Sequence, residues 1–390
     1  MKVINPATIT AAMLTSSTAA EPSGTDPAAW SSATSYAVGD KSFLASTHRI
    51  YQCLIGHLGN AAASATVTMT IAAPCVVTWT GHTLPLNATV KFTTTGALPG
   101  GLLPGTTYYV TAPATNTFSL AATPNGAAIT TTGTQSGTHT ATAATSSPDV
   151  NTSGSTPKWL DWSATNRWKM FDAEVNTQTI VTTPLTVVFT PGAINALALL
   201  ELSGTSATVT VKSAPGGSVV YSATKSLDGS VITDWYSYFT DPFTLIDSWV
   251  MTDIPAYASC EVTVSITAGS GNVYCGVMQA GLWYDIGNAQ YGANVGIVDY
   301  STKKIDSYGR TVLSVGNYSR RLNATLMMDT ASFYKTHKLL VSLRAKPCIW
   351  IGSEDSLYTP TVVFGYFKDF SIDVRYPTSV YCSLQVEGLT

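Results

Sequence analysis

The chain reads WSSATSYAVGD at residues 30–40, HRIYQC at residues 48–53 and, far downstream, PKWLDWSATNRWKMFD at residues 157–172. Each stretch is rich in aromatic residues and is too short to bury its own rings. A module of about 60 residues has few other side chains from which to build a core. We therefore interpret these stretches as two parts of one small β-module, which is opened by an insertion between them.

The rings of this split module have two possible roles. They form its hydrophobic core, or they form a platform on which sugar rings stack. Gly39 is expected to supply a turn that Asp40 caps through a side-chain hydrogen bond. The predicted core residues are Gly39, Asp40, Tyr51, Trp168 and Phe171. The candidate contacts for a glycan or a partner are Trp30, Tyr36, Trp159 and Trp162, and Tyr36 is also a candidate for the core.

The composition indicates a folded protein with few charges. The 390 residues are 45% hydrophobic and 11% charged, with a net charge of −3. This hydrophobic share is too high for global disorder, and the balance of charge provides no basic surface for nucleic acid. A surface of hydroxyl and small side chains is typical of a protein that is built into an assembly. We expect no membrane span, because no apolar run approaches about 20 residues, and no signal peptide in residues 1–17.

Short runs of Val, Ile, Thr, Tyr and Phe between Gly, Pro, Asn and Asp turns predict an all-β, multi-domain protein. Strands are expected at 182–190, 207–213, 218–223, 260–268, 273–278, 337–343 and 381–386. Residues 1–62 would hold a leader, which docks on another protein, and the first part of the split module. Residues 147–172 would hold the second part. Two antiparallel, jelly-roll-like β-sandwiches would follow at 173–283 and 284–390, with a seam at residues 281–294.

Residues 63–146 are dominated by Ala and Thr and carry almost no charge. A disordered linker is one interpretation of such low complexity. Apolar residues nevertheless recur at spaced positions, namely Val90, Phe92, Tyr109, Phe118 and Leu120. This spacing favours a folded β-domain with its own core, inserted into the split module.

The six cysteines are spread over the chain without a C-x-x-C motif. Most lie in apolar runs that predict strands. Buried free thiols, in a protein made in a reducing cytoplasm, are the favoured interpretation. A disulfide between Cys260 and Cys275 across a hairpin is the alternative.

No motif for catalysis, metal binding or cofactor binding occurs, and we predict no catalytic residue, no metal site and no cofactor. The segment 234–253 combines acidic and aromatic residues. Its candidate contacts for a glycan or a partner are Trp235, Tyr236, Tyr238 and Trp249. A loop that packs on the protein or on a neighbouring subunit is the simplest interpretation. Sugar stacking is the second, and hydrolysis by paired carboxylates is the third.

The pattern of Trp30, Tyr36, Gly39-Asp40, Tyr51-Gln52-Cys53 and Trp159 resembles the chitin-binding type carbohydrate-binding modules of bacterial hydrolases. With TNRWKMFD (165–172) following, it more closely resembles the N-terminal module of tail structural proteins of long-tailed bacteriophages. The leader PATITAAMLTSS (6–17) is similar to the start of those proteins. The insert resembles a small β-domain of phage tail and fibre proteins in GHTL (81–84), FTTTGALP (92–99), GTTYYV (105–110) and NTF (116–118).

These resemblances cover residues 1–172. The C-terminal half is similar to phage tail-tip β-sandwiches only in general character and not in any specific motif. They imply a non-enzymatic structural protein of the virion, in the tail tip or baseplate, which is made in the bacterial host cytoplasm. Its implied partners are other tail or baseplate proteins, copies of itself with three- or six-fold symmetry, and a host surface glycan. The module is interrupted and has no accompanying catalytic domain, which favours scaffolding over chitin binding. The alternatives are a receptor-binding adhesin for a host glycan and a glycan depolymerase.

Overall fold

The computed structural model describes residues 1–154, 156–230, 234–240, 242, 244–305, 307–374 and 376–389. It divides into two compact units, one formed by Glu21–Thr165 and the other by Met1–Ala20 together with Asn166–Thr390. Within the described residues, neighbouring strands of every sheet pair antiparallel. The predicted all-β, multi-domain class is therefore confirmed.

The first unit contains the split module. Strand β13 (Trp159–Ala164) pairs with β5 (Arg49–Cys53), which pairs with β4 (Lys41–Leu44). Strand β3 (Ser35–Tyr36) pairs with β6 (His57–Leu58), and the 3-10 turn η1 covers Pro148–Val150. Because Trp159 faces Cys53 in the register, the two distant aromatic stretches form one sheet.

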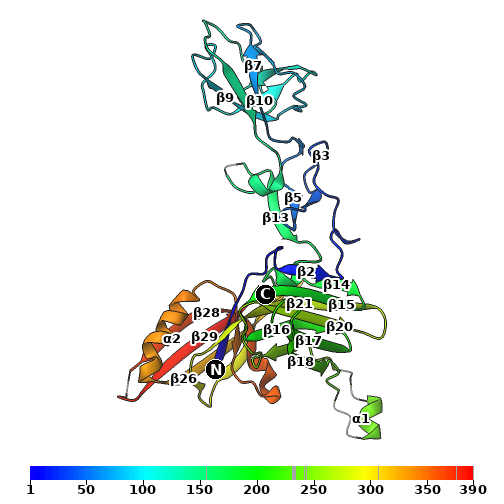
Figure 1. Cartoon of the computed structure of the whole chain (residues 1–390), viewed down its shortest axis with the longest axis vertical. Coiled ribbons are helices and arrows are strands. Elements are labelled where there is room, and N and C mark those ends of the chain that lie inside the picture. The colour runs from blue at the N-terminus through cyan, green and yellow to red at the C-terminus, as the bar shows by residue number, and fades with distance from the viewer. Residues whose placement is uncertain are drawn as a thin grey trace. The chain divides into compact units, whose positions relative to one another are not determined.

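The insertion is a closed six-stranded barrel with the strand order β10-β11-β8-β7-β12-β9 (Figure 1). Its strands are β7 (Ala63–Met69), β8 (Val76–Thr78), β9 (Thr89–Thr94), β10 (Tyr108–Thr111), β11 (Thr117–Ala121) and β12 (His139–Ala143). The chain leaves the module and returns to it at one crossing. There the Asn60 amide donates to Ser146 Oγ at 2.8 Å, and the Ser146 amide donates to the Asn60 carbonyl at 3.0 Å.

Alternation along the strands fills the barrel, because successive side chains of a strand point to opposite faces. Val90 and Phe92 of β9 are fully buried, and Phe118 and Leu120 of β11 are at most 1% exposed. In β10 the buried positions are Tyr108 and Val110. The prediction of Tyr109 as an inward residue is therefore one position out of register.

The second unit contains a five-stranded sheet with the order β18-β17-β20-β15-β2. Its strands are β2 (Leu14–Ser17), β15 (Leu185–Gly192), β17 (Ser206–Lys212), β18 (Val219–Ser226) and β20 (Cys260–Thr267). One face is apolar and buried, as in Val187, Val209 and Val264. Strand β15 contacts β21 (Asn272–Asp285), so this sheet packs on the larger sheet of the same unit.

The larger sheet has eleven strands, with the path β19-β16-β21-β1-β27-β28-β29-β26-β22. Those strands are β19 (Ser248–Met251), β16 (Ala196–Ser203), β21, β1 (Lys2–Pro6), β27 (Cys348–Ile351), β28 (Val362–Asp373), β29 (Ser379–Gly388), β26 (Tyr318–Asp329) and β22 (Asn288–Ala289). Strand β14 (Thr179–Thr182) pairs with β21, and β23 (Asn294–Asp299) pairs with β26.

Two expectations are corrected by this sheet. The leader was expected to dock on another protein, but it pairs within this chain. Strand β1 lies between β21 and β27, and β2 pairs with β15. The first part of the seam predicted at residues 281–294 lies inside β21, which continues without a break to Asp285. The two C-terminal regions therefore share one continuous sheet, which β1 completes between them.

Helix α2 (Thr330–Ser342) replaces the strand that was predicted at 337–343. The apolar run around Leu339 looks like a strand when read alone. Phe333, Leu339, Leu340 and Leu343 recur at helical spacing, and all four pack on the apolar face formed by β26, β28 and β29. Burial of this helical stripe decides the conformation.

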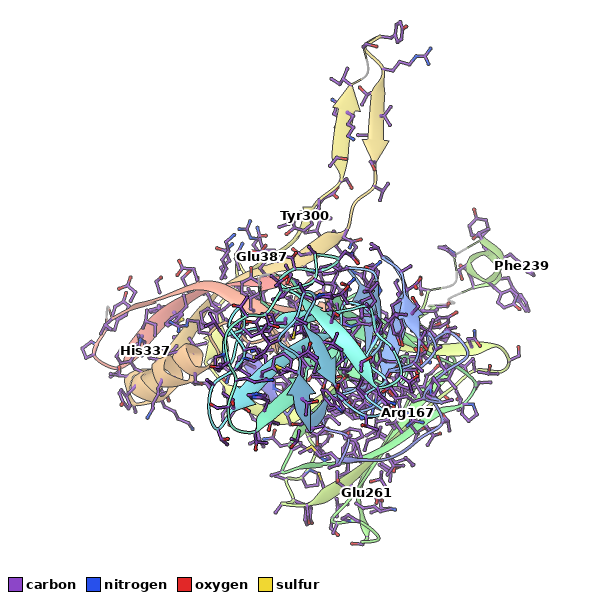
Figure 2. The ribbon with its side chains drawn as sticks, turned by 90° about the horizontal axis from the view of Figure 1, so that it is seen from above. Arg167, Phe239, Glu261, Tyr300, His337 and Glu387 are labelled. Atoms are coloured by element: carbon purple, nitrogen blue, oxygen red, sulfur yellow. The ribbon has the colours of Figure 1, made fainter. Side chains whose placement is uncertain are left out.

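Two segments of the second unit project from it. The hairpin of β24 (Thr302–Ile305) and β25 (Thr311–Ser314) stands away from the sheet beyond Tyr300, and α1 (Trp235–Thr240), with Phe239, forms a separate projection (Figure 2). The remaining elements are the 3-10 turns η2 (Lys169–Phe171) and η3 (Ser356–Thr361).

Candidate functional site

The rings of the split module form its core. Tyr36, Tyr51 and Trp159 are at most 6% exposed, and the Tyr36 and Trp159 rings meet edge to face with centroids 4.9 Å apart. The Trp159 indole N–H donates to the Ser146 carbonyl at 2.9 Å, which satisfies the polar atom of the ring. Tyr36 and Trp159 are therefore core residues and cannot stack on a sugar without unfolding the module.

Gly39 and Asp40 form a tight turn beside this core. Gly39 has φ +94°, which L-residues rarely adopt. Asp40 Oδ2 accepts a hydrogen bond from the Ala37 amide at 2.7 Å. Gly39 therefore forms the turn and Asp40 caps it, as the sequence suggested.

Two tryptophans of the module remain accessible. Trp162 is 47% exposed, and the Lys41 ammonium lies 3.7 Å from its ring centroid. Trp30 is partly buried against the module core. Of the four predicted contact residues in the module, Trp162 is the one with an open ring face, and a lysine already covers part of it.

Trp168 and Phe171 belong to the second unit and not to the module, since the division between the units falls after Thr165. Phe171 packs against Trp168 and Phe189, with ring centroids 5.7 Å apart in both pairs. Trp168 is buried and Phe171 is partly buried, but both pack in the second unit and not in the module core that was predicted for them. The motif TNRWKMFD thus spans the boundary between the two units.

The predicted aromatic segment separates into two places. Trp235, Tyr236 and Tyr238 lie on α1 with Phe239, and each of the four side chains is 57–79% exposed. Trp235 and Phe239 stack with centroids 6.4 Å apart, so the rings contact one another rather than a core. Trp249 lies on β19, away from α1. It is partly buried and lines a cavity together with Tyr221.

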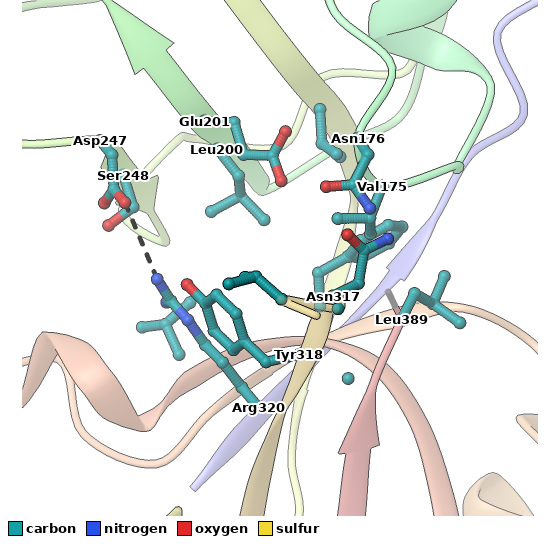
Figure 3. A pocket seen from close by; sticks show the side chains of 16 residues that line it. Val175, Asn176, Leu200, Glu201, Asp247, Ser248, Asn317, Tyr318, Arg320 and Leu389 are labelled. Carbon is teal, nitrogen blue, oxygen red and sulfur yellow. Dashed lines mark ion pairs between the residues drawn. The ribbon is translucent and has the colours of Figure 1, made fainter. Parts of the chain in front are cut away.

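A pocket of about 400 Å³ lies elsewhere in the second unit, between β16, β26 and the end of β29 (Figure 3). The larger part of its lining is apolar and includes Leu200, Val277, Val362, Phe364 and Leu389. Its polar lining consists of Asn176, Glu201, Asp247, Ser248, Asn317, Tyr318 and Arg320. The Arg320 guanidinium pairs with Asp247 Oδ2 at 3.7 Å. A concave, mostly apolar site with a few polar groups is the usual form of a small-molecule site.

Glu201 is held in this pocket by unusual backbone geometry. Its φ is +54°, a left-handed conformation that costs about 1–2 kcal/mol for a residue with a Cβ. Leu200 pairs with Val277 and Leu202 with Cys275, so Glu201 lies directly opposite Gly276 in an unshifted register. A Cβ on Gly276 would lie 2.4 Å from Glu201 Oε2. Glycine at 276 therefore makes the space that the carboxyl group occupies.

The electrostatics of Glu201 are also unusual. Burial raises the pKa of its carboxyl above the ordinary value, a Gln178 hydrogen bond lowers it, the Asp247 carboxylate raises it and Arg320 lowers it. Oε2 is buried without a hydrogen-bond partner. The same desolvated surroundings, with Glu201 nearby, raise the pKa of the Cys275 thiol to about 12.

Sequence reasoning missed Glu201 because it lies in the apolar run INALALLELS (194–203), which predicts a plain strand. The one signal available is a single acidic residue within a strand of that kind. The six cysteines are confirmed as buried free thiols, Cys260 and Cys275 included.

No group of three or more His, Cys, Asp or Glu suited to a metal ion occurs within the part of the chain that the structure describes. Among those same residues, no helix has the length and apolar character needed to cross a membrane. Comparison with protein-family models, with curated proteins and with solved structures finds no match to this chain.

Proposed function

We propose that this chain is a structural component of a bacteriophage virion, in the tail tip or baseplate. Its N-terminal module docks to the tail, and the second unit contributes to assembly or host attachment. The resemblances of residues 1–172 support this proposal. The protein is made in the bacterial host cytoplasm and acts without catalysis, in contact with other tail or baseplate proteins and with copies of itself around a three- or six-fold axis.

The hairpin of β24 and β25 is the observation that carries the proposal. Every residue of both strands is exposed, and its large apolar side chains include Ile305 (65%), Val312 (56%) and Leu313 (71%). An isolated two-stranded hairpin is marginally stable in water. Apolar side chains exposed in this way mark a surface that another protein covers. A scaffold protein whose partners cover such an arm fits these properties.

Cryo-electron microscopy of particles produced by the genome that encodes this chain tests the proposal. We expect density for both units at the distal end of the tail, with the hairpin against a neighbouring protein. A matched genome in which a short Gly-Ser turn replaces residues 302–314 should yield tails without this protein or with an incomplete tip. Particles that lack the protein in both cases would refute the virion assignment.

A receptor-binding adhesin is the second candidate, and α1 is the observation that favours it. Four exposed rings on one short helix provide faces on which sugars stack. Purified protein that blocks adsorption of the phage to its host would support adhesion. The variant in which Trp235 and Phe239 are both alanine should then lose this effect. Undiminished blocking by that variant would exclude α1 as the adhesive surface.

A further inference from the structure

The pocket around Glu201 has no role in the scaffold proposal, and its construction needs an explanation. A carboxyl oxygen without a hydrogen-bond partner is unfavourable when it is buried. The positive φ of Glu201 and the missing Cβ of Gly276, which lies opposite, together place this oxygen against β21. Strained, unpaired polar groups of this kind concentrate at sites that bind ligands.

The charges around the pocket identify what is missing. Glu201 and Asp247 are acidic, and Arg320, which pairs with Asp247, is the basic residue of the described lining. When Glu201 is ionised, the lining therefore carries one negative charge in excess. A single positive group with hydrogen-bond donors complements this charge. A primary ammonium group has both properties.

The rest of the lining identifies the body that carries the ammonium group. Asn176 and Asn317 offer amide donors and acceptors, and Ser248 and Tyr318 offer hydroxyls. Opposed to these is an apolar surface that includes Leu200, Phe364 and Leu389. A sugar ring matches both surfaces, because its hydroxyls lie around an edge and its C–H groups form an apolar face.

We propose that this pocket binds an amino sugar with a free amine, whose ammonium group pairs with Glu201. The amide and hydroxyl groups of Asn176, Asn317 and Tyr318 receive the sugar hydroxyls, and the apolar lining receives the C–H face. This site is independent of the virion proposal, because purified protein suffices to test it. If the protein is found in the virion but does not bind the sugar, only the site proposal fails. If it binds the sugar but is absent from the virion, only the virion proposal fails.

Isothermal titration calorimetry of the full chain with D-glucosamine at about pH 6.5, where amines are protonated, tests the proposal. We expect saturable one-to-one binding of D-glucosamine and binding weaker by about tenfold or more for N-acetyl-D-glucosamine, which has the same ring without the charge. A lysine side chain is the other source of an ammonium group, and Nα-acetyl-lysine amide is the probe for it. Tighter binding of that probe than of D-glucosamine would overturn the amino-sugar assignment.

Two variants locate the site. Glu201→Gln keeps the shape of the side chain and should weaken D-glucosamine binding by about tenfold or more. Glu201→Gly relieves the positive φ, so the protein should fold at least as well as the wild type and still lose binding. Glu354→Gln, which removes an acidic group outside this pocket, should bind as the wild type does. Unchanged binding by both Glu201 variants would refute the site.

The pH dependence gives an independent readout. Burial raises the pKa of Glu201, and the charged or titratable groups that face it are Asp247, Arg320 and the Cys275 thiol. An ammonium ligand favours the ionised carboxylate, so binding should release protons and weaken as the pH falls through the raised pKa. Glu201→Gln should lose this dependence. Proton release that is identical in the variant and the wild type would contradict the proposed pairing.

Discussion

At the scale of single residues, burial separates side chains that the sequence makes look alike. Trp159 and Trp162 lie three positions apart on β13, yet Trp159 is fully buried and Trp162 is 47% exposed. The register of β13 shifts between Asp161 and Ser163, so strict alternation does not hold along this strand. Aromatic composition alone could therefore predict a core but not which rings belong to it.

Replacing Trp159 by alanine should lower the free energy of unfolding of the first unit by about 3–5 kcal/mol, because a buried ring and its hydrogen bond to Ser146 are lost. Trp162→Ala is the matched control and should cost about 1 kcal/mol or less, mainly from the contact with Lys41. Hydrogen–deuterium exchange of peptides from residues 21–165 measures both effects. Equal losses in the two variants would contradict the assignment of Trp159 to the core.

Glu201 predicts a pH dependence of stability. Its carboxyl has a raised pKa in the folded protein, so its favourable contribution is present below the unfolded pKa, near 4.5, and is lost as the pH rises through the folded value. Glu201→Gln lacks this titration. Thermal unfolding should therefore show the variant gaining stability relative to the wild type between about pH 4 and pH 7. A difference in melting temperature that stays constant over this range would show that Glu201 does not titrate as proposed.

At the scale of elements, the sequence predicted strands well where period-two alternation was complete. It failed where a neighbour decides the conformation. Helix α2 forms because its apolar stripe is covered by β26, β28 and β29, and a seven-residue run does not reveal that cover. Glu201 was missed for a related reason, since its left-handed backbone and its place opposite Gly276 depend on the pairing with β21 and not on its own residue type.

Strand β1 shows how strongly position in a sheet determines the effect of one residue. Ile4 is fully buried on this central strand, whereas Ile297 on β23 is 64% exposed. Ile4→Ala should therefore cost about 2–5 kcal/mol in the second unit, and Ile297→Ala should stay within about 0.5 kcal/mol. Chemical denaturation of the full chain, with the two variants compared side by side, measures the difference. A small effect at Ile4 would mean that β1 is not a stable part of the sheet.

At the scale of the whole molecule, the plan of a module opened by an insertion was accessible from the sequence, since both aromatic stretches and the composition of the insert are local signals. The boundary after Thr165 was not accessible. TNRWKMFD reads as one motif, but Trp168 and Phe171 find their packing partner, Phe189, in the following region. Contacts made across the sequence, rather than the motif itself, decide where a folding unit ends.

The closed barrel predicts independence of the insert. Replacing residues 63–143 by a short Gly-Ser linker should remove one calorimetric transition and leave the module and the second unit folded, because Asn60 and Ser146 still meet. Exchange protection of β5 and β13 after the deletion is the measurement. Loss of that protection would show that the barrel supports the module.

The place of β1 also sets the order in which this protein can be built. Its neighbours, β21 and β27, are formed by residues 272–285 and 348–351, so residues 2–6 leave the ribosome long before either partner exists. The barrel and module, complete by residue 165, can fold while β1 remains unpaired. Domains generally fold as units during synthesis, and exposed strand edges favour aggregation. The first strand can therefore take its place between β21 and β27 only after residues 272–285 and 348–351 have been made.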